Sequence, residues 1–304
     1  MLRRFVIEIA IVAVLGGGGF WILTVPQTVP ASALGQHEAD LANGRTVFIA
    51  GGCSGCHAVP GADDKTRLGG GLALKSPFGT FYMPNISSDR RDGIGAWSEA
   101  EFVTALSQGT SPDGRHYYPA FPYTSYQRMR PDDLRDLFAY LKTLPAVSGK
   151  VREHDMSFPF SFRRGLGLWK LLYLDGKPFA PDPTKSAMLN RGAYLVEGAG
   201  HCAECHSPRN LIGGIIAAQR FAGGPNPEGK GWIPNITQKD LGEWSEKDIA
   251  YLLETGQTPD GDSIGGAMTE VVRHTSQLAP EDRAAIAAYI KSLPPVEGPK
   301  PTKK

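Results

Sequence analysis

Every cysteine of this chain belongs to one of two Cys-x-x-Cys-His motifs, residues 53–57 (CSGCH) and 202–206 (CAECH). This pattern is the attachment signature of c-type haem. Two cysteines at this spacing can form thioethers with the vinyl groups of one porphyrin, and the adjoining histidine can reach the iron. A zinc site would have to unite two distant cysteine pairs, and a disulfide framework is typical of short secreted chains. The motifs therefore predict two covalently attached haem c groups, held by Cys53, Cys56, Cys202 and Cys205.

The composition is that of a globular protein with long loops. The chain has 304 residues, enough for two domains with separate cores. Its 32 basic and 31 acidic residues nearly balance, so a nucleic acid is not an expected partner. Glycine (37 residues) and proline (24 residues) are abundant. We interpret this excess as ordered loops wrapped around a prosthetic group.

The N-terminus has the pattern of a targeting segment. Arg3 and Arg4 precede the apolar stretch 5–24, which is long enough to span a bilayer. The basic flank favours a cytoplasmic N-terminus. A cleaved signal peptide is the alternative, because Ala31-Ser32-Ala33 resembles a cleavage site. We expect residues 1–33 to be an inner-membrane anchor or a signal peptide, and either one places the rest of the protein in the periplasm.

The remainder of the chain is an internal duplication. Residues 97–114 (WSEAEFVTALSQGTSPDG) match residues 244–261 (WSEKDIAYLLETGQTPDG) without a gap. Residues 130–147 likewise match residues 279–296, and the tetrapeptide PNIS in the first half corresponds to PNIT in the second. We therefore expect two similar domains, 34–147 and 187–297.

Local patterns predict helices within each repeat. Ser98 with Glu101 forms a capping box, and Ser245 with Asp248 forms a weaker one. Strand-like alternation is scarce, so the expected fold is mainly α, with two tandem class I-type cytochrome c domains. Residues 148–186 have no counterpart in the repeat. We interpret them as a connector that packs on both domains, or alternatively as a membrane-surface element. Residues 298–304 are expected to form a solvated tail.

The axial ligands of the two irons follow in part from the motifs. His57 and His206 are the expected proximal ligands, because each adjoins its attachment cysteines. Met268 lies in the loop before the final helix and is the expected distal ligand of the second haem. When the two repeats are aligned, Phe121 of the first half matches Met268 of the second, and phenylalanine cannot bind iron. We predict Met129 as that ligand, with a five-coordinate iron or ligation by His116 as the alternatives.

Four further residues recur in both halves and are candidates for contacts with the haem propionates. They are Asn85, Asn235, Trp97 and Trp244. Their amide and indole N–H groups could donate hydrogen bonds to buried carboxylates. Simple packing is the alternative explanation for the two tryptophans.

The segments GGCSGCHAVPG, SPFGTFYMPNIS, PDGRHYYPAFPYTSYQRM and GHCAECHSPRN resemble the cytochrome c subunits of membrane-bound alcohol, gluconate and related dehydrogenases. The resemblance covers nearly the whole chain after residue 40. It implies haem domains that accept electrons from a catalytic subunit and pass them to ubiquinone or an oxidase. It also implies that His57, His206 and Met268 are axial ligands. This chain differs in having two haem motifs where well-known members have three, and in having Phe121 where methionine is common.

The expected function is therefore single-electron transfer from a periplasmic or membrane-bound dehydrogenase to a quinone, an oxidase or another cytochrome. The alternative is a dihaem oxidoreductase, peroxidase-like or of the thiosulfate type, in which an open first haem is the reaction site. Only the missing methionine at position 121 favours that alternative.

Overall fold

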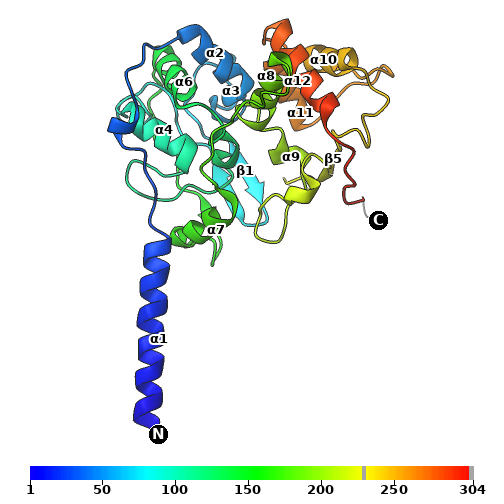
Figure 1. The fold of residues 1–304 in the computed structure, drawn as a ribbon. Coiled ribbons are helices and arrows are strands. Elements are labelled where there is room, and N and C mark those ends of the chain that lie inside the picture. Colours follow the sequence, from blue (N-terminus) through cyan, green and yellow to red (C-terminus); the bar gives the residue numbers. More distant parts are fainter. Residues whose placement is uncertain (228–230, 301–304) are drawn as a thin grey trace.

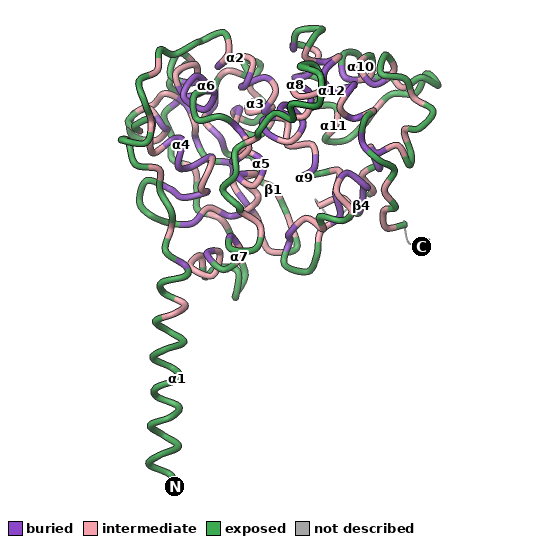
Figure 2. The backbone as a smooth tube through the Cα atoms, in the orientation of Figure 1, coloured by how far each residue is buried: buried purple, intermediate pink, exposed green. Residues whose placement is uncertain are grey.

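The computed structural model describes residues 1–227 and 231–300. Two helical modules lie side by side, and one long helix, α1 (Leu2–Leu23), projects from beneath the first module (Figure 1). None of the residues of α1 is buried (Figure 2). This architecture confirms the mainly helical fold predicted from the sequence. Of the predicted tail 298–304, residues 301–304 lie outside the described residues.

The two modules repeat one order of helices, as the sequence repeat predicts. The first module contains α2 (Leu41–Ala50), α3 (Cys53–His57), α4 (Glu99–Gln108), α5 (Tyr123–Tyr126) and α6 (Pro131–Thr143). The second contains α8 (Ala187–Glu197), α9 (Ala203–His206), α10 (Glu246–Thr255), α11 (Ala267–Thr275) and α12 (Pro280–Ser292). Helix α7 (Leu166–Tyr173) of the connector and three short 3-10 helices complete the helical structure of the described residues: η1 (Ala31–Ala33), η2 (Arg163–Gly165) and η3 (Ala217–Gln219).

The small amount of β structure lies in the long loops that follow the attachment motifs and in the connector. In the first module β1 (Ala73–Ser76), β2 (Gly79–Tyr82) and β3 (Asp155–Met156) form one antiparallel sheet. In the second module β4 (Gly224–Pro225) pairs with β5 (Trp232–Ile233). The connector contributes β3, so it packs on the first module. This small sheet was not predicted, because its strands are too short for a clear alternating pattern.

The ends of the helices follow from local chemistry. Both predicted capping boxes are present, at the start of α4 and at the start of α10. Each of these two helices ends at a glycine in the left-handed region, Gly109 (φ 58°) and Gly256 (φ 77°). Only glycine adopts this conformation without strain, so the chain can leave the helix sharply at these points. The final helices α6 and α12 each begin with a proline in the first turn.

In each module the first helix crosses the last helix at a glycine. A methyl group on Gly44 of α2 would overlap the backbone carbonyl of Asp136 in α6. A methyl group on Gly192 of α8 would overlap the carbonyl of Ala285 in α12 in the same way. The two backbones are therefore in direct contact at both crossings. This contact fixes the frame that holds each attachment motif, since α3 follows α2 closely and α9 follows α8.

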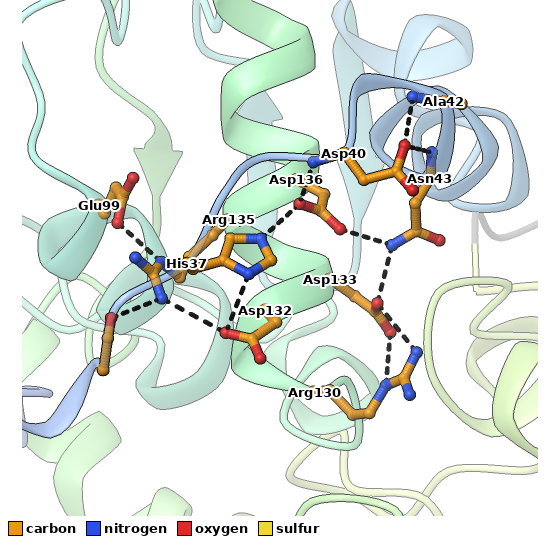
Figure 3. A network of polar contacts seen from close by, with 11 residues as sticks. His37, Asp40, Ala42, Asn43, Glu99, Arg130, Asp132, Asp133, Arg135 and Asp136 are labelled. Atoms are coloured by element: carbon orange, nitrogen blue, oxygen red, sulfur yellow. Dashed lines mark hydrogen bonds and ion pairs between the residues drawn. The ribbon is translucent and has the colours of Figure 1, made fainter.

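A buried polar network reinforces the crossing of α2 and α6 in the first module (Figure 3). One carboxylate oxygen of Asp136 accepts hydrogen bonds from His37 Nε2 at 2.6 Å and from the backbone N–H of Asp40 at 2.9 Å. The other oxygen accepts from Asn43 Nδ2 at 2.8 Å. Asn43 also donates to Asp133, which forms an ion pair with Arg130. The network joins the segment that enters α2 to one face of α6.

The C-terminal end of α1 is held by the connector. Thr24, the residue that follows α1, is fully buried. Arg164 Nε donates to Thr24 Oγ1 at 2.8 Å, and its NH2 group donates to the carbonyl of Trp21 at 2.7 Å. Helix α7 (Leu166–Tyr173) passes directly over Thr24 at Gly167, where a Cβ atom would lie 2.6 Å from Thr24 Cα. The helix end is thus packed into the protein body through specific contacts.

Replacement of Gly44 by alanine is expected to destabilise the protein by about 1–3 kcal/mol, because the added methyl group would separate α2 from α6. Gly35→Ala is the matched control, since a Cβ atom at Gly35 has no neighbour within 4 Å. Denaturant unfolding of the two holoprotein variants would measure the difference. Equal unfolding midpoints for both variants would contradict the close crossing.

Asp136→Asn is expected to lower the unfolding free energy by about 1–3 kcal/mol at neutral pH, because hydrogen bonds to a charged acceptor are lost. Burial raises the pKa of Asp136, but hydrogen bonds from Asn43, Asp40 and His37 outweigh it, so the pKa lies below its ordinary value. A carboxyl group with a lowered folded-state pKa stabilises the fold above its unfolded pKa. That contribution is lost as pH falls through the folded pKa.

The difference between the wild type and Asp136→Asn should therefore shrink in acid. Denaturant titrations from neutral pH down through the carboxyl range would measure it. A difference that stays constant across this range would show that the charge of Asp136 plays no part in the stabilisation.

Candidate haem-binding sites

Each attachment motif forms a single short helix that is stabilised by its surroundings. Helix α3 begins after Gly52, whose φ of 57° turns the chain sharply out of α2. Cys53 is partly buried and Cys56 is exposed, and Cys202 and Cys205 of the second motif show the same division. Burial raises the pKa of the Cys53 and Cys202 thiols to about 12. No metal-binding cluster of three or more His, Cys, Asp or Glu side chains is present among the described residues.

The two histidines of the motifs are held in the same orientation. His57 Nδ1 donates to the carbonyl oxygen of Pro84 at 2.8 Å, and His206 Nδ1 donates to that of Pro234 at 2.8 Å. This hydrogen bond fixes the tautomer and leaves Nε2 free to bind iron. Burial lowers the pKa of both imidazoles, which favours the neutral form that metals require. The residues present therefore fit a haem iron bound on the proximal side by each histidine.

The loop that carries each proline is tied to the end of the module. Asn85 Nδ2 donates to the carbonyl of Val147 at 2.7 Å and to that of Gly149 at 3.2 Å. Asn235 Nδ2 donates to the carbonyl of Val296 at 2.8 Å. The predicted hydrogen bonds from these asparagines to the propionates stay a prediction. Both amide hydrogens of Asn85 are directed at backbone carbonyls, so these asparagines brace the loop that positions the proximal histidine.

The two recurrent tryptophans pack against the hydrophobic core. Trp97 and Trp244 are both half-buried and contact the main cluster of apolar residues. Neither indole N–H group makes a hydrogen bond to another described residue. Their predicted donation to the propionates stays a prediction, and their packing role is present in the structure.

The four residues predicted or weighed as distal groups occupy different surroundings. Met268 is partly buried in the first turn of α11 and packs against the core. Met129 is almost fully buried, with 2% of its surface exposed, between α5 and α6. Phe121 directly precedes α5, and its ring contacts those of Tyr117 and Tyr126 edge-on, at centroid distances of 5.5 and 5.6 Å. His116 is bonded through Nε2 to the carbonyl of Thr24 at 2.9 Å, so that nitrogen is occupied at the end of α1.

The attachment helix of each module contacts the other module at the helix that precedes its final helix, α5 or α11. We call these two helices, with the residues just before them, the distal segments. Ser54 of α3 is hydrogen-bonded to His274 Nε2 of α11 at 2.7 Å. Glu204 of α9 accepts hydrogen bonds from Thr124 at 2.9 Å and Ser125 at 3.0 Å, both in α5. This reciprocal pattern is the tertiary counterpart of the sequence repeat. It places both attachment helices along the boundary between the modules, which we name the seam.

Aromatic and polar pairs continue the seam on both sides of these contacts. The rings of Tyr126 and His201 meet edge-on at 5.8 Å. The hydroxyl of Tyr194 in α8 donates to Asp133 in α6, and it accepts from the backbone N–H of Arg130 at 3.1 Å. The modules thus form a continuous packed interface.

Several of these residues were not identified from the sequence. The carbonyls of Pro84 and Pro234 could have been suspected, because the Pro-Asn pair recurs at almost the same distance after each attachment motif. Ser54, Glu204 and His274 gave no such signal, since the two repeats differ at these positions. Contacts between modules depend on how the modules dock, and neither repeat encodes this by itself.

Comparison with known proteins agrees with this geometry. The cytochrome c family model matches residues 41–145 and again residues 189–294. A protein described as diheme cytochrome c-type, from Cereibacter sphaeroides, is 48% identical over 299 residues, which cover 98% of this chain and 100% of that protein. A subunit of the nicotinate dehydrogenase of Pseudomonas putida is 39% identical over 276 residues, which cover 90% of this chain and 23% of that subunit.

Cytochrome subunits of sugar and alcohol dehydrogenases are also similar. The alcohol dehydrogenase (quinone) cytochrome c subunit of Gluconacetobacter polyoxogenes is 38% identical over 265 residues, which cover 83% of this chain and 56% of that subunit. The chain thus spans little more than half of that relative. The chain belongs to the cytochrome c family, as a dihaem cytochrome c related to the cytochrome c subunits of membrane-bound alcohol, gluconate and fructose dehydrogenases.

Proposed function

We propose that this protein is a membrane-anchored electron carrier that takes single electrons from a periplasmic or membrane-bound dehydrogenase and delivers them to the respiratory chain. The observation that carries the proposal is the repeated site: two attachment motifs, each with its histidine fixed by a proline carbonyl, along one seam. Haem c, when bound, supplies a one-electron couple in each module. The chain itself has to attach, orient and partly shield these groups.

The residues around the sites suit a relay. His57 and His206 are each held in one orientation, because their Nδ1–H groups donate to backbone carbonyls. The asparagine braces and the glycine crossings hold the surrounding loops. Small reorganisation around a redox centre is an advantage for electron transfer, since a preorganised site needs no rearrangement when the charge changes.

The dehydrogenase donor is inferred from the relatives. Their names assign them to nicotinate, fructose, alcohol and gluconate dehydrogenases. This chain covers 23% to 63% of those proteins, so their remaining parts have no match in it. We propose a separate dehydrogenase subunit as the donor and a quinone, an oxidase or another cytochrome as the acceptor.

We propose further that α1 is retained as an anchor in the inner membrane, with the modules in the periplasm. Helix α1 has the length and composition to cross a bilayer. Cleavage after Ala33 would remove Thr24 and leave Arg164 and His116 without their partners at the end of α1. When α1 is retained in the membrane, exposed apolar residues of the connector near its C-terminal end face the membrane surface: Phe158, Phe160, Phe162, Leu168, Leu171 and Leu172.

In the native organism, a C-terminally tagged copy should stay in the membrane after an alkaline wash and yield peptides from residues 1–33 by mass spectrometry. Its haems should become reduced when an oxidisable alcohol, hexose, sugar acid or nicotinate is added to the membranes. A dehydrogenase subunit should copurify with it. Release by the wash would contradict the anchor, and haems that none of these substrates reduces would contradict the dehydrogenase donor.

Met268 is the proposed distal ligand of the second haem, so Met268→His should keep that iron six-coordinate and lower its midpoint potential. A thioether ligand favours the reduced iron more than an imidazole does. We expect a shift on the order of 0.2 V, a fraction of the ~0.8 V range that axial ligands cover. Potentiometric titration would measure it, with Met188→His as the control, because Met188 is exposed on α8. Unchanged potentials for both haems would contradict ligation by Met268.

A further inference from the structure

The distal segments of the two modules can be aligned through their backbone hydrogen bonds on the side that precedes the ligand position. The N–H of Tyr117 donates to the carbonyl of Gly109, and the N–H of Ile264 donates to that of Gly256. Both glycines end the equivalent helices α4 and α10. Tyr117 therefore matches Ile264. Four positions further along each chain, Phe121 matches Met268.

A second alignment holds on the side that follows the ligand position. The N–H of Met129 donates to the carbonyl of Tyr126 at 2.9 Å, and the N–H of Leu278 donates to that of Thr275 at 3.1 Å. Two residues later the final helices begin, each with a proline. Met129 therefore matches Leu278, and both side chains are buried in the core, with 2% and 4% of their surfaces exposed.

The two alignments separate the ligand position from the core position. In the second module Met268 and Leu278 are both present, so these two positions serve different purposes. The segment between these two positions is longer in the second module than in the first. There it contains the 9-residue helix α11, whereas the first module has the 4-residue helix α5. Met129 has the place of the core leucine. Its Cγ lies 3.3 Å from where a Cβ atom on Gly198 would be, so the side chain packs across the seam against the second module.

Phe121 belongs to an aromatic wall beside the first attachment motif. Its ring lies between those of Tyr117 and Tyr126. The ring of Tyr126 also meets that of His201 edge-on, and His201 Nε2 is hydrogen-bonded at 3.3 Å to the carbonyl of Gly51, two residues before Cys53. Burial raises the pKa of Tyr117 to about 12 and that of Tyr126 well above its usual value, so both phenols are neutral. The wall is therefore uncharged, and a phenyl ring has no lone pair to donate to iron.

We infer that the first haem has no methionine ligand, and that its iron keeps a coordination position which a small neutral diatomic molecule such as carbon monoxide can occupy. This inference rests on the proposed binding of two haems and concerns the first of them. The second haem is closed by Met268. An uncharged aromatic wall favours a neutral ligand over an anion, because burial of an unpaired charge is costly. The inference replaces Met129, the ligand predicted from the sequence.

Carbon monoxide titration of the reduced holoprotein tests the inference directly. The wild type should bind one molecule of carbon monoxide per two haems, seen as half of the spectral change that two open haems would give. Phe121→Met should abolish binding and add the weak red charge-transfer band that a methionine–iron bond gives in ferric haem c. The mirror variant, Met268→Phe, should bind two molecules and lose the band that the wild type shows.

Met129→Leu is the decisive control, because it introduces the residue that already occupies the equivalent place in the second module. It should leave both carbon monoxide binding and the red band of the wild type unchanged. If the wild type binds no carbon monoxide and Met129→Leu does bind it, Met129 is the ligand and the inference is wrong. If neither protein binds it, another group closes the iron, and the inference is equally wrong.

The haem content separates a failure of this inference from a failure of the proposed function. A pyridine haemochrome assay should give two covalent haems per chain in the wild type and in all three variants. A wild-type chain with fewer than two covalent haems would overturn the proposed function itself. Two haems with no carbon monoxide binding would overturn only the assignment of an open first iron.

Discussion

The hydrogen bond from a histidine Nδ1–H to a proline carbonyl is the interaction on which both sites depend. A histidine next to its attachment cysteines can reach an iron, but its ring can rotate about the side-chain bonds. The Pro84 and Pro234 carbonyls remove that freedom and fix the tautomer, so Nε2 is the nitrogen available to the metal. A proline carbonyl can serve here only if its loop is held in place. Asn85 and Asn235 hold that loop to the end of each module.

The crossing of the first and last helices supports both the attachment helix and the proline loop of each module. The first and last helices of each module meet at a glycine, and that crossing is the frame from which the attachment helix and the proline loop both extend. The polar network around Asp136 reinforces the frame in the first module. In the second module, Gly192 meets Ala285 at the same crossing. Equivalent backbone contacts are thus supported by different side chains in the two halves of the duplication.

The seam distinguishes a dihaem protein from two joined monohaem proteins. Each attachment helix is hydrogen-bonded to the segment that covers the distal side of the other module, through Ser54 with His274 and through Glu204 with Thr124. A change in the distal segment of one module can therefore reach the attachment helix of the other. The two modules also differ before their final helices, since Phe121 and Met268 hold the same place in the repeat. The duplication has kept the contacts of the motif histidine and of the asparagine after the proline, and it has varied the segment before the final helix.

The sequence by itself determined the cofactor class, the duplication and the capping of the helices, and it supplied the prediction of the two proximal histidines. These features are local: a five-residue motif, a capping box or an N-terminal apolar stretch acts over a few positions of the chain. Only the tertiary structure decided the contacts of Asn85, Thr24 and Glu204. The partners of these residues lie in distant segments or in the other module, so their roles depend on how the helices pack. Asn85 is an example. Its recurrence in both halves is visible in the sequence, but its acceptors, the carbonyls of Val147 and Gly149, come close to it only because the chain after the last helix packs against the loop.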